Sequence, residues 1–255
     1  PLAFTPNLGQ TDPAVYYQVH DLRGTLSLTA DGLILSQQNG TALQMAYLGT
    51  NSTKIITGLE SLAGKTNYII GNKPDQWHLN LTTYSSILYK NLYSGIDLQY
   101  QGKSGIFETV YQVAPGADPS LIRWQHTGVS QVQIDSVTGD LLLTLAGTQT
   151  ILTEQAPKAW QIVNGKEISV PIKYTQYSDG SFGFTLGKYD SSLAVNIDPT
   201  LTYSTFLGGS NLDDAEAVAI DAEGNIYITG TTNSPDYPVQ APLQSEKNGS
   251  EDVFV

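Results

Sequence analysis

Residues 25–36 read "TLSLTADGLILS", two runs of alternating apolar and polar side chains that flank Asp31-Gly32. Alternation with a period of two places one side-chain face in a core and the other in solvent, as in a half-buried β-strand. An Asp-Gly pair between two such runs is a strong local signal for a β-hairpin. This stretch therefore predicts antiparallel β structure early in the chain.

Similar short runs, separated by turn residues, extend from Tyr16 to Phe184, and helical periodicity is almost absent. One exception is near Asp118, which we expect to cap a single turn beginning at Pro119, since proline is tolerated at the first helical position. Many short strands at a spacing of about 8 to 12 residues are typical of sandwiches and barrels. We therefore expect an all-β fold, with a large N-terminal β-sandwich or barrel-like domain over residues 1–199.

The composition excludes several classes of partner. The chain has 255 residues, a formal net charge of −12 and no cysteine. Phosphate backbones and anionic membrane surfaces would repel such a protein, so we expect no nucleic acid partner. No run approaches the roughly 18 apolar residues of a membrane span, so we expect no membrane insertion. A start at Pro1 without Met is most simply a processed or trimmed chain, and a signal peptide removed before this point is one expectation consistent with it.

The pattern changes at Asp198-Pro199, because the residue before a proline favours extended geometry and often marks a boundary. Residues 200–255 then form a second module. Its runs "EAVAID" and "NIYITG" both alternate, which predicts a hairpin closed by a turn at 222–225. With further strands expected at 203–207 and 251–255, the module has the size and make-up of one β-propeller blade.

Linked motifs in this module resemble the bacterial seven-bladed β-propeller repeat of the SBBP type. They are Tyr-Ser-Thr-x-Leu-Gly-Gly at 203–209, an Asp-x-x-Gly-Asn turn at 221–225, and Thr-Gly-x-Thr-x-Ser at 229–234. Upstream, "FTPNLGQTDPAVYY" and "GKTNYIIGNKPDQWHLNLTTY" are similar to the uncharacterised β-rich domain that precedes such repeats. The resemblance implies export and an extracellular or bacterial cell-surface location, and it implies that further repeats follow.

Oxygen-bearing side chains in the second module suggest a calcium site, because hard cations prefer carboxylate and carbonyl oxygens. Turn formation and solubility are the alternative roles, since the spacing differs from the helix-loop-helix calcium motif. No other cofactor is expected. The candidate ligands are Asp213, Asp214, Asp221, Glu223 and Asn225.

Catalytic signals are weak. The carboxylate pairs Asp213-Asp214 and Glu251-Asp252 are adjacent in sequence, whereas a glycosidase pair must face across a cleft. The histidines His20, His78 and His126 lack the spacing of zinc ligands. We therefore expect no catalytic residues.

The working hypothesis is a non-enzymatic module of an exported surface protein, acting in adhesion, matrix or filament assembly. Protein partners or further copies would add to exposed strand edges, expected at 226–230 and 251–255. Glycans are a second class of partner, because the tryptophans and tyrosines can stack on sugar rings. Core packing and cross-strand pairing are the alternative roles for these aromatic residues. The alternative is a secreted polysaccharide-active enzyme with a propeller-lined cleft. The three tryptophans are Trp77, Trp124 and Trp160.

Overall fold

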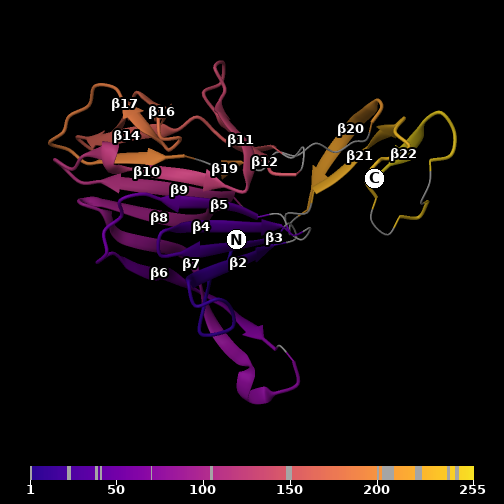
Figure 1. Cartoon of the computed structure of the whole chain (residues 1–255), viewed down its shortest axis with the longest axis horizontal. Coiled ribbons are helices and arrows are strands. Elements are labelled where there is room, and N and C mark those ends of the chain that lie inside the picture. The colour runs from indigo at the N-terminus through magenta and orange to yellow at the C-terminus, as the bar shows by residue number, and fades with distance from the viewer. Residues whose placement is uncertain are drawn as a thin grey trace. The chain divides into compact units, whose positions relative to one another are not determined.

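A computed structural model of the chain shows an all-β protein in two compact units, Pro1–Ser204 and Thr205–Val255 (Figure 1). The sequence-based boundary at 199/200 lies just before β19 (Leu201–Thr202), which pairs with a strand of the first unit. The structure describes residues 2–21, 24–37, 40, 42–69, 71–103, 106–147, 151–199, 201–202, 210–221, 226–239, 242–244 and 247–255.

Two large antiparallel sheets make up most of the first unit. The eight-stranded sheet has the order β1-β2-β3-β4-β5-β10-β17-β16. Its strands are β1 (Thr5–Pro6), β2 (Val15–Asp21), β3 (Gly24–Thr29), β4 (Gly32–Gln37), β5 (Ala42–Tyr47), β10 (Arg123–Thr127), β17 (Phe182–Leu186) and β16 (Ile172–Gln176). The seven-stranded sheet has the order β15-β14-β18-β9-β8-β7-β6. Its strands are β15 (Lys166–Val170), β14 (Lys158–Val163), β18 (Val195–Asp198), β9 (Ile106–Val113), β8 (Ile96–Lys103), β7 (His78–Tyr93) and β6 (Ile55–Tyr68).

A smaller sheet and two single turns complete this unit. The four-stranded sheet runs β11 (Val129–Ile134), β12 (Leu141–Leu145), β13 (Ile151–Glu154), β19. The 3-10 turns are η1 (Pro74–Gln76), at the tip of the projecting β6–β7 hairpin, and η2 (Pro119–Leu121). The expected cap of η2 is confirmed, because Asp118 accepts a hydrogen bond from the Ser120 amide at 2.9 Å.

The hairpin predicted from residues 25–36 is confirmed as β3 and β4, and Leu28 pairs with Leu33. The two residues between the strands are Ala30 and Asp31, so Gly32 begins β4 instead of lying in the turn. A Cβ at position 32 would collide with the carbonyl oxygen of Met45 on β5. The close approach of the neighbouring strand, more than the turn, therefore requires glycine there.

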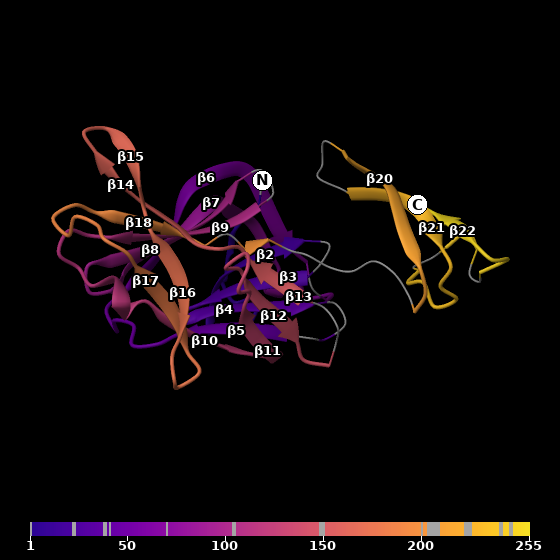
Figure 2. The same cartoon turned by 90° about the horizontal axis from the view of Figure 1, so that it is seen from above.

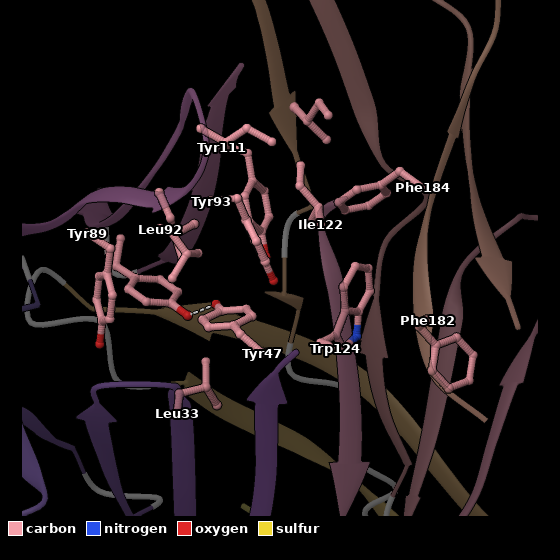
Figure 3. Close-up of a cluster of buried hydrophobic side chains, with 14 of the residues drawn as sticks. Leu33, Tyr47, Tyr89, Leu92, Tyr93, Tyr111, Ile122, Trp124, Phe182 and Phe184 are labelled. Carbon is pink, nitrogen blue, oxygen red and sulfur yellow. Dashed lines mark hydrogen bonds between the residues drawn. The ribbon is translucent and has the colours of Figure 1, made fainter. Parts of the chain in front are cut away.

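The core of the first unit is rich in aromatic rings that come from both large sheets (Figure 3). The hydroxyls of Tyr47 on β5 and Tyr100 on β8 share a short hydrogen bond. The ring of Tyr111 on β9 meets that of Phe184 on β17 edge-on, with centroids 5.8 Å apart. Leucines of β12 and β13 join the same core. The all-β prediction is confirmed, and within the described residues no sheet closes on itself.

The second unit contains an antiparallel sheet in the order β20 (Asp213–Ile220), β21 (Ile226–Thr232), β22 (Asp252–Phe254) (Figure 2). The expected hairpin pairing is confirmed, since Val218 lies opposite Ile228. The turn at 222–225 and the strand expected at 203–207 lie outside the described residues.

Candidate binding surfaces

Strand β20 exposes apolar side chains on both of its faces. Every residue from 214 to 219 is exposed, including Ala215, Ala217 and Ala219. Val218, on the other face from Ala217 and Ala219, has an exposed fraction of 66%. A strand that is solvated on one face normally alternates apolar with polar residues, whereas a strand covered on both faces is apolar throughout. Residues 217–220 of β20 are all apolar, so this half of the strand is suited to cover on both faces, whereas Asp213, Asp214 and Glu216 make the other half polar.

The strand order refines one expectation about open edges. Strand β21 pairs with β20 over residues 226–232 and with β22 only over residues 230–232. Within the edge expected at 226–230, only residue 230 therefore lies between two strands, and in the described part of the chain 226–229 pair with β20 alone. Strand β22 pairs only with β21 among the described residues, which leaves its other side available at residues 252–254.

The carboxylates proposed as calcium ligands are not all brought together. Asp213 accepts hydrogen bonds from the hydroxyls of Thr232 and Ser234, and the latter is 2.9 Å away. Asp221 accepts from the hydroxyl of Tyr227 at 3.0 Å. Asp213 begins β20 and Asp221 follows its last residue, eight positions later and roughly 25 Å away at the usual rise, so these two cannot bind one ion.

The remaining candidates add little to such a site. Asp214 leaves the opposite face of β20 from Asp213, as consecutive strand residues do. Glu223 and Asn225 lie outside the described residues. Across the described part of the chain, no three His, Cys, Asp or Glu side chains are placed to hold a metal ion.

Of the second carboxylate pair, Asp252 makes local hydrogen bonds. Asp252 accepts hydrogen bonds from the Asn248 amide at 2.7 Å and from the Gln244 side-chain amide at 2.8 Å.

Among the histidines, burial lowers the pKa of His126 to about 4, and its ring packs on Phe182. The described residues therefore show no convergence of these groups on a common site.

The tryptophans do not form a shared stacking surface. Trp124 is buried in the core, where its ring packs on Phe184 at 5.0 Å between centroids. Trp77 follows η1 in the projecting hairpin, and Trp160 lies on β14, and both are half-buried. Trp124 is therefore unavailable to a ligand. The spacing of the tryptophans in the sequence could not distinguish core from surface.

A hollow of about 700 Å³ lies where the 7–14 loop and the start of β2 meet β6. Sequence reasoning missed it, because Ile56 on its far side is some forty residues from the loop. The described residues that line it are all uncharged. They are Pro6, Asn7, Leu8, Gly9, Thr11, Pro13, Val15, Tyr16, Tyr17 and Ile56.

Both tyrosines reach this hollow because β2 carries a β-bulge. The pairing of β2 with β3 shifts between Val15 and Tyr17, which makes Tyr16 the extra residue. Consecutive residues of a regular strand point to opposite faces, and a bulge re-aims a side chain. Tyr17 is anchored by its hydroxyl, which accepts from the Gly58 amide at 2.9 Å, while Tyr16 is 45% exposed.

One buried acid was also missed from the sequence. Burial raises the pKa of the Glu154 carboxyl to about 7. Glu154 ends β13 opposite Leu201 of β19, and the hydroxyl of Tyr174 on β16 donates to the neighbouring Gln155 carbonyl at 2.9 Å. This carboxyl therefore lies near strands of different sheets.

The fold defines an all-β protein. Comparison with known families then assigns the chain to a family. Residues 4–200 match the family described as "Domain of unknown function (DUF7948)", and the chain belongs to this family. Residues 202–238 match the family described as "Beta-propeller repeat" (SBBP). No curated protein and no solved structure matches the chain. Among the described residues, no helix is long and apolar enough to cross a membrane.

Proposed function

We propose that the chain is a non-enzymatic assembly module of an exported bacterial surface or extracellular protein. In this proposal the first unit is a two-sheet sandwich, and the second is a propeller-type blade whose faces and β22 edge are covered by further blades or protein partners. The observation that carries the proposal is the exposure of apolar side chains on both faces of β20. The match of residues 202–238 to a β-propeller repeat supports it.

A neighbouring unit that covers the faces of the blade would stabilise it. Burial of apolar surface contributes roughly 25 cal/mol per Å², and a lone blade leaves that contribution unused on both faces. Repeat architectures obtain their stability from interfaces between neighbouring units. An isolated blade is therefore expected to open more readily than the same blade beside a neighbour. The uncovered edge at 252–254 offers backbone groups for the same association.

The test is a chain in which residues 200–255 are duplicated in tandem. Hydrogen exchange of β20 and β21 amides in the first copy is expected to slow by about tenfold or more, since the second copy covers one face. Val218→Asp in both copies should abolish this protection. Ile168→Asp on β15 is the matched control, because Ile168 is an exposed strand residue of the first unit. Unchanged exchange in the tandem chain would refute the proposal.

A further inference from the structure

The hollow beside β2 has the dimensions and rigidity of a ligand site. Its volume of about 700 Å³ falls within the usual range for small-ligand pockets. The Asn7 side chain ties the loop together, donating to the carbonyls of Asp12 at 2.8 Å and Val15 at 2.9 Å. The Gln10 side-chain amide donates a hydrogen bond to the Pro6 carbonyl and accepts one from the Leu8 amide. A wall fixed in this way loses little conformational entropy when a ligand binds.

The residues that line the hollow disfavour a charged ligand. The chain carries a net charge of −12, yet the described lining residues of the hollow are all uncharged. Asp12 belongs to the same loop but is not among them, and its carboxylate accepts from the Ala14 amide at 2.8 Å. An ionic ligand would find no described partner of opposite charge in the lining. The ligand that fits is therefore neutral.

The polar and aromatic groups favour a sugar over a peptide strand. An added β-strand would bond to outward backbone groups of β6, but the Gly58 amide already donates to the Tyr17 hydroxyl. The bulge at Tyr16 turns a second aromatic side chain to the same hollow. Aromatic and aliphatic side chains pack on the C–H face of a pyranose ring, and the Tyr16 and Thr11 hydroxyls suit its hydroxyl groups.

We propose that this hollow binds a neutral sugar unit of a glycan chain, with Tyr16 as the exposed stacking residue. The site is separate from the blade surfaces of the proposed assembly function. It would allow the first unit to hold a polysaccharide while the blade joins other proteins.

The experiment titrates the whole chain with chitohexaose, cellohexaose and mannohexaose, and follows the amide signals of residues 7–17 by NMR. At least one neutral oligosaccharide is expected to shift these signals in a saturable way. Tyr16→Ala should weaken that binding about tenfold, whereas Tyr16→Phe should retain it within about threefold. Tyr227→Ala is the matched control, since Tyr227 is 53% exposed on β21, and it should leave affinity unchanged.

Three results would overturn the proposal. The first is the absence of saturable shifts at residues 7–17 with every neutral oligosaccharide at millimolar concentration. The second is binding of an oligogalacturonate or a proline-rich peptide at this hollow in place of the neutral sugars. The third is an equal loss of affinity in Tyr16→Ala and Tyr227→Ala, with both variants folded by thermal melting.

Discussion

Gly32 lies at the start of β4, where the carbonyl of Met45 on β5 occupies the space that a Cβ would need. We expect Gly32→Ala to destabilise the first unit by about 3 kcal/mol, because the backbone of β4 or β5 must move. Gly49→Ala is the comparison, since Gly49 has a φ of +69° but no atom within 4 Å of an added Cβ. It should cost only about 1 kcal/mol. Urea unfolding measures both, and equal losses would contradict the crowding argument.

A second prediction concerns the pH dependence of stability, because burial raises the pKa of the Glu154 carboxyl in the folded state. A carboxyl whose folded pKa lies above its unfolded value stabilises the fold fully below about pH 4.5. That stability is lost as pH rises through about 7. The loss amounts to about 3 kcal/mol between pH 4 and pH 8. Glu154→Gln should remove this dependence.

The measurement is the difference in unfolding free energy between wild type and Glu154→Gln at each pH. The comparison is needed because the lowered pKa of buried His126 has the opposite effect, with stability lost as pH falls below 6.5. That contribution is common to both proteins and cancels. Glu167→Gln, at an exposed position on β15, should show no such difference. A pH-independent difference for Glu154→Gln would show that the carboxyl is solvated.

At the scale of elements, the ring of Phe254 adds side-chain packing to the backbone pairing of β22 with β21. Phe254 lies opposite Gly230, where an added Cβ would be 2.7 Å from its Cζ atom, and it stacks on Tyr237 at 4.6 Å between centroids. Phe254→Ala is expected to destabilise the blade by about 2 kcal/mol, because both ring contacts are lost. Val253→Ala is the control, since Val253 is exposed. Hydrogen exchange at β21 should rise in the first variant alone.

Elements also show how far a local pattern can predict structure. The 25–36 hairpin and the turn capped by Asp118 were predicted correctly, because each depends on a few consecutive residues. The pairing of β22 with residues 230–232 of β21 was not predicted, since β22 joins it from some twenty residues away. The same limit applies to the hollow, whose lining combines a loop with Ile56. The bulge at Tyr16 leaves no mark in "AVYYQV" that separates it from a regular strand.

At the scale of the whole molecule, composition predicted the all-β class, whereas the depth of each polar or aromatic group depended on packing. Trp124 belongs to the core and Glu154 is also buried, although the sequences of their strands resemble those of neighbouring strands. Long-range pairs such as β5 with β10 and β9 with β18 decide those positions. Such pairings are set by the complementarity of whole faces, which a single sequence does not display.

The strand order has a kinetic consequence. Strands β2 to β5 and β6 to β9 are each joined in chain order, so two meanders can form from contacts that are close in sequence. Contacts of this kind form faster than those that close long loops. The eight-stranded and seven-stranded sheets are completed only when β16 to β18, residues 172–198, have been added. We therefore expect a chain emerging from its N-terminus to fold as two early meanders, and to lock them together in a late step once β18 is in place.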